Sequence, residues 1–285
     1  MESDYGSNWN IRDLLADLME ARSSARPEPR EVIWASDLGK PYVDRWLQMK
    51  GVPYSNPPNG QELMTYFLGW QIEVGIEEML LSAGLATRSQ EKVTVHLDGH
   101  LPVVGRADLI LEVRDWEGVL AKLEEGSAED PAIPPRELAQ RQALRRILGD
   151  WRGRSPQGLS ATVFEVKSLN SAAFKYHRGG EGLSSAYPHH RLQLYTYLRG
   201  LGLGEGHLVY VARDTGWMEE VVVRPTEELE RAWRGDVEAM SRYYLGDERP
   251  PLEPLKVGGK ENWRVRYSRY RDYLYKEVHD GPFSF

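Results

Sequence analysis

Two charged residues interrupt a largely apolar stretch at residues 162–170, TVFEVKSLN. Because side chains alternate along a strand, Glu165 and Lys167 would project from the same face of a predicted strand. Burying a charge costs several kcal/mol unless a partner or a metal ion compensates it. A carboxylate and an ammonium placed side by side here therefore suggest a site that acts on a charged group.

Two further acidic residues occupy positions where a neutral residue would cost less free energy to bury. Asp108 lies between GRA and the apolar LIL, and Glu73 lies on a predicted helix over 61–83. If the strands of Asp108 and Glu165 are neighbours, both carboxylates could converge on one hard cation, for which oxygen ligands favour magnesium or manganese. Lys167 could then orient, or help to deprotonate, a metal-bound water, and the metal would offset charge at a phosphoryl group.

Each of these signals has a structural alternative. The Glu165–Lys167 spacing also fits an exposed ion pair, Asp108 fits a turn, and Glu73 fits the polar face of a helix. Gln193 and Tyr197 are four apart on a predicted helix over 188–200 and so share a face. An adjacent active site could satisfy their hydrogen bonds, but a core tyrosine with a glutamine at its rim explains them equally well.

The remaining pattern predicts the elements that must position these residues. An Asp98-Gly99 turn between alternating segments indicates a hairpin, and the strand of Glu165 is followed by the strands HLVYVARD and MEEVVVRP. Helices are predicted over 8–22, from a Ser36-Asp37 N-cap to Gly51, and from Thr226 to about Tyr244. Together these elements predict an α/β domain with a central mixed sheet flanked by helices.

Three segments are expected along the chain. Residues 1–60 form an N-terminal helical segment that packs on the core, 61–225 form the core, and 226–285 form a C-terminal helical segment. Residues 115–160 look like an insertion in the core, with an acidic loop, a start at Pro134-Pro135 and then a helix to about Leu148. This insertion could gate a DNA channel or dock a protein partner. It could equally be a solvent-exposed segment without a specific role.

Composition excludes several classes of function. The chain of 285 residues contains no cysteine, which excludes disulfides, thiolate metal sites, iron–sulfur clusters and thiol nucleophiles. No apolar run approaches the length needed to cross a membrane, and no signal-peptide pattern opens the chain, so a cytoplasmic protein is expected. The net charge of −7 argues against a general polyanion binder, although basic residues gather between 167 and 199.

The order of the motifs resembles that of a known family. Gly69-x-x-x-Glu73, GRAD, EVK and Gln193-x-x-x-Tyr197 are similar to the ordered motifs of the PD-(D/E)XK nucleases, most closely the RecB-type exonuclease branch that includes the CRISPR-adaptation nucleases. The resemblance extends from about Ser36 to Tyr273 and implies a restriction-endonuclease-like core. It implies that Asp108, Glu165 and the Val166 carbonyl bind the metal, that Lys167 is the catalytic lysine, and that Gln193 and Tyr197 position the site or the DNA.

The sequence departs from this family at two places. The helix position often held by a metal-binding histidine is Glu73, which can also bind a hard cation. Many of these relatives hold an iron–sulfur cluster through four cysteines, whose places are taken here by Pro41, Val265, Ser268 and Leu274. The resemblance therefore implies a version without the cluster, in which the terminal segments pack by aromatic and aliphatic contacts.

These observations lead to one main hypothesis and two alternatives. The main hypothesis is a Mg²⁺- or Mn²⁺-dependent DNA nuclease that hydrolyses phosphodiester bonds with a metal-activated water, with exonuclease action on single strands or duplex ends implied by the resemblance alone. Lys175, Arg178 and Arg191 are candidates for backbone contacts, and Tyr176 and Tyr187 could stack on bases or anchor loops. The alternatives are a catalytically silent nucleic-acid-binding or scaffold protein and an unrelated metal hydrolase that acts on small phosphate esters.

Overall fold

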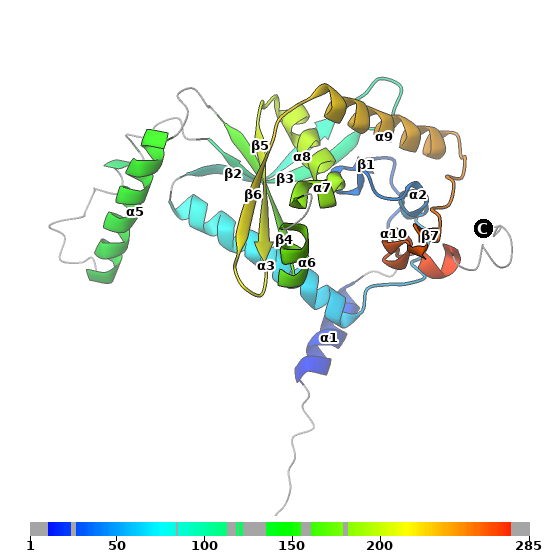
Figure 1. Cartoon of the computed structure of the whole chain (residues 1–285), viewed down its shortest axis with the longest axis horizontal. Helices are drawn as coiled ribbons and strands as arrows, with labels where there is room; N and C mark the ends of the chain where they lie inside the picture. Colours follow the sequence, from blue (N-terminus) through cyan, green and yellow to red (C-terminus); the bar gives the residue numbers. More distant parts are fainter. Residues whose placement is uncertain are drawn as a thin grey trace, which may run out of the picture. The chain divides into compact units, whose positions relative to one another are not determined.

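The computed structural model describes residues 11–23, 27–83, 85–112, 118, 120–121, 135–154, 161–178 and 182–274 (Figure 1). The chain divides into two compact units. The terminal unit comprises Met1–Gln71, His96–Val104 and Glu230–Phe285, and the sheet unit comprises Ile72–Val95 and Gly105–Leu229. Each unit therefore combines segments that are distant in the sequence.

A mixed β-sheet forms the centre of the sheet unit. Its strands are β2 (Ala86–Val95), β3 (Val103–Leu111), β4 (Thr162–Leu169), β5 (Gly206–Ala212) and β6 (Met218–Val223). β3 pairs with β2 and, antiparallel, with β4; β4 and β5 are parallel, and β5 and β6 are antiparallel. The predicted α/β class with a mixed central sheet is confirmed.

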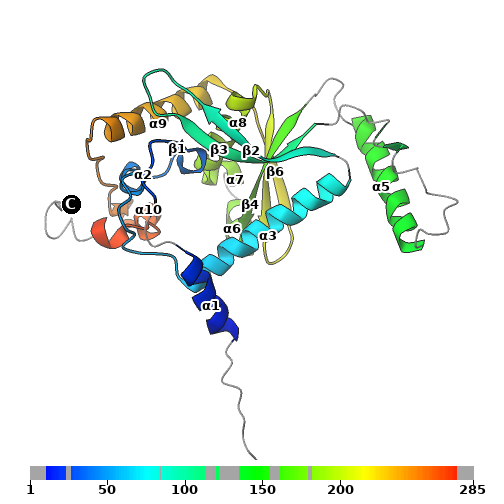
Figure 2. The same cartoon turned by 180° about the vertical axis from the view of Figure 1, so that it is seen from behind.

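Helices cover both faces of this sheet. On one face α8 (Pro188–Leu201) contacts β2, β4, β5 and β6, and it approaches β2 so closely that a Cβ at Gly200 would lie 2.2 Å from Val93 Cγ1. The part of α3 (Gly60–Ser82) that follows Ile72 lies on the opposite face (Figures 1 and 2). Two short helices, α6 (Ser171–Arg178) and α7 (Leu183–Ala186), lead into α8.

The expected insertion contains one long described helix, α5 (Pro135–Arg154), which starts at the second proline of the predicted Pro134-Pro135 start and continues past the predicted end near Leu148. The acidic residues of this insertion, Glu124, Glu125, Glu129 and Asp130, lie outside the described residues.

The terminal unit contains short elements from both ends of the chain. These are α1 (Ile11–Arg22), β1 (Ile33–Trp34), the 3-10 helix η1 (Ala35–Asp37), α2 (Tyr42–Met49), most of α9 (Glu227–Leu245), β7 (Lys256–Val257), β8 (Lys260–Glu261) and α10 (Trp263–Arg266). β1 pairs in parallel with the first two residues of β3. None of the described helices combines the length and apolar character that a membrane crossing requires.

The predicted N-cap at Ser36-Asp37 is wrong, because α2 begins at Tyr42, directly after Pro41. A residue that precedes a proline is disfavoured in the helical region, so a helix started at Asp37 could not continue through Lys40. The Asp37 carboxylate instead accepts hydrogen bonds from Arg30 at 2.6 Å and from Lys40 at 3.1 Å.

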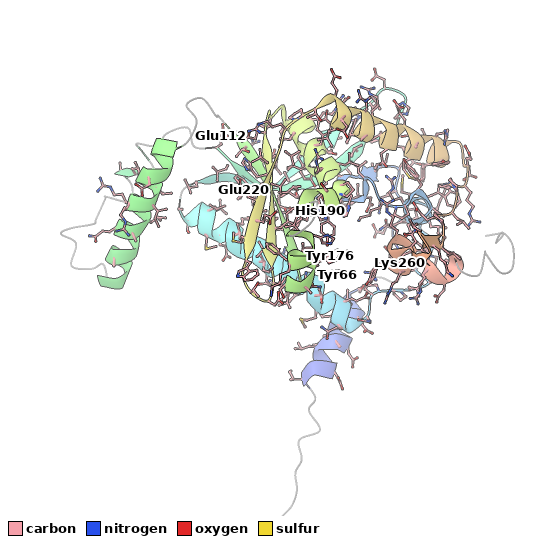
Figure 3. The ribbon with its side chains drawn as sticks, viewed as in Figure 1. Tyr66, Glu112, Tyr176, His190, Glu220 and Lys260 are labelled. Atoms are coloured by element: carbon pink, nitrogen blue, oxygen red, sulfur yellow. The ribbon has the colours of Figure 1, made fainter. Side chains whose placement is uncertain are left out.

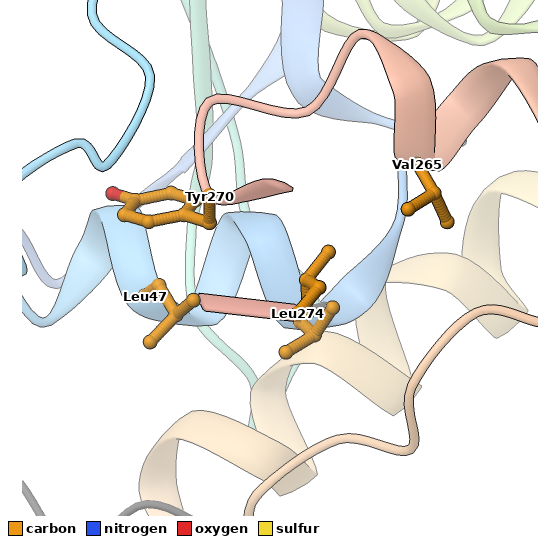
Figure 4. Close-up of a cluster of buried hydrophobic side chains, with 5 residues drawn as sticks. Leu47, Val265, Tyr270 and Leu274 are labelled. Atoms are coloured by element: carbon orange, nitrogen blue, oxygen red, sulfur yellow. The ribbon is translucent and has the colours of Figure 1, made fainter. Parts of the chain in front are cut away.

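A buried cluster joins the N- and C-terminal segments within the terminal unit. Val43 and Leu47 of α2 pack with Val265, Tyr270 and Leu274 (Figure 4). Val265 and Leu274 stand at two of the positions where the resemblance places cysteines, and here both are almost completely buried aliphatic side chains. The terminal segments therefore pack by aromatic and aliphatic contacts at these positions.

Candidate active site

Adjacent strands bring Asp108 and Glu165 together. The ladder between β3 and β4 ends at the pair Leu109 and Phe164, and continuing its register by one residue places Asp108 opposite Glu165. Both side chains are buried, with 9% and 1% of their surface exposed. The two carboxylates that the sequence predicts to converge therefore lie side by side, at the point where the two strands stop pairing.

Glu165 is held by two neighbours through the same oxygen. Lys167, two residues along β4, forms an ion pair with Glu165 Oε1, and the Gln193 amide of α8 donates a hydrogen bond to that atom. The same amide donates to the Tyr197 hydroxyl at 3.1 Å, which confirms that Gln193 and Tyr197 share a helix face. The other oxygen, Glu165 Oε2, is buried and has no hydrogen-bond partner in the described structure.

Asp108 and Glu73 complete the acidic group. The Val166 amide donates a hydrogen bond of 2.9 Å to Asp108 Oδ2, so the backbone between Glu165 and Lys167 orients the second carboxylate. Glu73 of α3 accepts a hydrogen bond of 2.7 Å from the Gln90 side chain of β2. Each carboxylate thus comes from a different element and is positioned by a different donor.

The electrostatics of this group reflect three carboxyl groups and one amine. Burial, and next the charge of Glu165, raise the pKa of Asp108 to about 8. Burial, and next the charge of Asp108, raise the pKa of Glu73 to about 7. Burial also raises the pKa of Glu165, with Lys167 opposing the shift. Burial acts to lower the pKa of Lys167, but the charges of Glu165 and Asp108 outweigh it and the pKa is raised. The site therefore favours added positive charge.

The chemistry of these side chains suits a hard divalent ion. Within the described part of the chain, no three His, Cys, Asp or Glu side chains already surround one point as metal ligands do. However, Glu165 Oε2 is a buried carboxylate oxygen that lacks a partner, and burying such an atom is costly unless something compensates it. Carboxylate oxygens are also the donors that Mg²⁺ and Mn²⁺ prefer.

The predicted DNA-binding residues lie on α6 and α8 of the same unit. Lys175 is exposed, with its ammonium 5.1 Å from the centre of the Trp217 ring. Tyr176 is 79% exposed (Figure 3). Arg191 is half-buried in the first turn of α8, and Arg178 ends α6 with a side chain outside the described part.

Sequence reasoning missed two of the contacts that build the site. The Val166 amide binds Asp108, whereas the resemblance implied only a role for the Val166 carbonyl. Gln90, which binds Glu73, has a left-handed backbone conformation with φ of 50° within β2. Residues other than glycine that adopt a left-handed backbone conformation often mark functional positions. The residue types around Gln90 do not predict that conformation.

Comparison with known proteins gives little further information. Neither a protein-family model nor a curated protein matches this chain. Among solved structures, the crystal structure of SSO0001 matches with 16% identity and a TM-score of 0.49, covering 91% of this chain and 93% of that chain.

Proposed function

We propose that this protein is a divalent-metal-dependent DNA nuclease that hydrolyses phosphodiester bonds. One observation carries the proposal: the two buried carboxylates of Asp108 and Glu165 lie together with the Lys167 ammonium, and one oxygen of Glu165 is left without a partner. The order of the motifs in the sequence, which resembles that of the PD-(D/E)XK nucleases, supports the same conclusion independently of the geometry.

Asp108, Glu165 and the Val166 carbonyl would hold the ion, with Glu73 close enough to influence the charge of Asp108. A bound divalent ion would supply charge neutralisation and Lewis-acid polarisation of a phosphoryl oxygen. Preorganised charge of this kind, aimed at the position where negative charge develops, is commonly the largest contribution to such catalysis.

Lys167 would contact the reacting phosphate. Its ammonium has three donors, of which one is used by Glu165 Oε1, and its side chain is 22% exposed. The remaining donors can bind a phosphate oxygen and orient the attacking water. Gln193 fixes the Glu165 carboxylate from the other side and is itself positioned by Tyr197, so both are positioning residues.

Cleavage of labelled single-stranded and duplex DNA in Mg²⁺ or Mn²⁺ tests this proposal. Wild-type protein should cut at least one of these substrates, and Lys167→Ala should lower the rate about 10²-fold or more, as expected when a positioned proton-transfer or charge-stabilising group is removed. DNA binding by Lys167→Ala, measured in EDTA, should remain.

Two results would contradict the proposal. Absence of cutting by the wild-type protein with either metal would favour a nucleic-acid-binding or scaffold protein. Equal cutting by wild type and Lys167→Ala would show that the activity arises elsewhere.

A further inference from the structure

Hydrolysis of a phosphodiester bond produces an alkoxide, a strong base that takes up a proton as the bond breaks. The groups that meet in the candidate site are poor donors of this proton. Asp108 and Glu165 would bind the ion in their charged forms. Although burial opposes it, the charges of Glu165 and Asp108 raise the pKa of Lys167, and burial raises the pKa of Tyr197. A group that exchanges protons near neutral pH would suit this step better.

His190 of α8 lies next to the position of Lys167 (Figure 3). The parallel register of β4 and β5 pairs Lys167 with Tyr210, so both side chains project from the same face of the sheet. The Tyr210 hydroxyl lies 3.1 Å from Nδ1 of His190. The imidazole therefore contacts a direct neighbour of the proposed catalytic lysine.

A second contact gives the same placement independently. Gln193 lies one helical turn after His190 on α8 and donates a hydrogen bond to Glu165, which precedes Lys167 by two residues on β4. His190 and Gln193 share a face of α8 and are separated by about 4.5 Å along its axis. Glu165 and Lys167 are separated by about 6.6 Å along their strand. A helix that meets Glu165 at one turn and Tyr210 at the next therefore carries His190 toward Lys167.

The contacts of His190 hold its ring in one orientation. Tyr187 stacks on the imidazole, with ring centroids 5.2 Å apart and an interplanar angle of 21°. Tyr210, which is fully buried, holds Nδ1. A hydrogen bond to one ring nitrogen fixes the direction of the other, and histidine is the side chain that most readily exchanges a proton near neutral pH. This arrangement is suited to proton transfer.

We propose that His190 is the general acid that protonates the leaving oxygen, and that Tyr210 is its positioning residue. This inference rests on the proposed nuclease function and adds a catalytic residue to it. Water attacks phosphorus, forms one P–O bond and releases one proton to solvent. The P–O bond to the leaving oxygen breaks, its electron pair goes to that oxygen, and the His190 imidazolium supplies the proton. The neutral imidazole then regains a proton from solvent.

A substrate whose leaving atom needs no proton tests this role. Replacing the leaving oxygen of one phosphodiester bond by a bridging sulfur makes the leaving group a thiolate, which is a much weaker base than an alkoxide. Strands with sulfur at the 3′ or at the 5′ bridging position, each compared with the all-oxygen strand, cover both directions of cleavage. Rates are measured in single turnovers in Mn²⁺, on the single-stranded or duplex form that the wild type cuts.

The loss caused by His190→Asn should depend on the leaving atom. On all-oxygen DNA the variant should be about 10²-fold slower than the wild type or more, as expected when a general acid is removed. On the strand in which sulfur leaves, it should cut within about threefold of the wild type, because general acid catalysis no longer contributes. Tyr210→Phe keeps the ring but removes the hydroxyl, so it should show a smaller loss with the same dependence.

Two further variants are matched controls. His189→Asn, at the adjacent histidine, should cut both strands as the wild type does. Lys167→Ala should be slow on both strands, because its ammonium acts on the phosphate and not on the leaving atom. DNA binding by His190→Asn, measured by fluorescence anisotropy in EDTA, should equal that of the wild type; if this variant failed to fold, Tyr210→Phe provides the same comparison.

The outcomes separate this inference from the proposed function. Equal losses of His190→Asn on the oxygen and sulfur strands, or no loss on either, would overturn the role of His190 and leave the nuclease proposal intact. Absence of cutting of every strand by the wild type would overturn the proposed function itself.

Discussion

The pairing of Glu165 with Lys167 makes a quantitative prediction about stability. Lys167→Met keeps most of the side-chain volume but removes the ammonium that compensates Glu165, which is 1% exposed. Removing one partner of a buried ion pair costs about 3–5 kcal/mol. Because Lys167 is itself 22% exposed, the cost should lie near the lower limit, about 3 kcal/mol.

A second substitution separates this loss from catalysis. Adding Glu165→Gln removes the uncompensated charge while keeping an amide or oxygen for Gln193 to contact, so the double variant should recover to within about 1 kcal/mol of the wild type. The proposed nuclease activity should nevertheless be absent from the double variant, because both charged groups are gone. Lys175→Met, at an exposed lysine of the same unit, should change stability by less than about 0.5 kcal/mol.

Urea unfolding followed by far-UV circular dichroism in EDTA measures these free energies. The reasoning would be refuted if Lys167→Met were as stable as the wild type, or if the double variant were no more stable than Lys167→Met alone. Either result would mean that Glu165 does not depend on Lys167 for its charge compensation.

Further predictions concern the metal, the packing of α8 and the terminal unit. Mn²⁺ at about 100 times its Kd should stabilise the protein by about 2.7 kcal/mol and raise its Tm by about 5 °C, as measured by differential scanning fluorimetry. Asp108→Asn should abolish this rise in Tm. If the variant kept the rise, the ion would bind elsewhere. Gly200→Ala should lower the free energy of unfolding, measured in urea, by about 1–3 kcal/mol, because the added methyl group meets Val93. Gly235→Ala should be neutral or stabilising, because a Cβ at Gly235 would have no atom within 4 Å. Equal effects of the two substitutions would contradict the close contact of α8 with β2. Burial raises the pKa of Asp44 to about 6, so the folded protein binds this proton more tightly than the unfolded chain and loses stability as pH rises from about 4 to 6. Asp44→Asn should therefore raise the Tm at pH 7 and leave it unchanged near pH 4, and a gain of equal size at both pH values would contradict the assignment.

The periodicity of side chains along strands and helices predicts much of the site. Alternation alone places Glu165 and Lys167 on one face, and a spacing of four places Gln193 beside Tyr197; the structure confirms both. The convergence of Asp108 and Glu165 was conditional on their strands being neighbours, since strand order is a tertiary property that periodicity does not determine. The antiparallel pairing of β3 with β4 meets that condition.

Two local features outside the site have recognisable signals in the sequence. Asn170 caps α6, where its side chain accepts a hydrogen bond of 2.7 Å from the Ala173 amide, and asparagine is a favoured N-cap residue. Gly258-Gly259 forms the turn between β7 and β8 with φ of 59° and 79°, a glycine pair typical of two-residue hairpins.

The central claim is that Asp108 and Glu165 bind one divalent ion beside Lys167. Anomalous diffraction from crystals grown with Mn²⁺ tests it most directly. The account predicts an anomalous peak within about 2.0–2.6 Å of an oxygen of each carboxylate, the range of hard-cation coordination. A well-ordered site with no peak between these two residues would contradict the account.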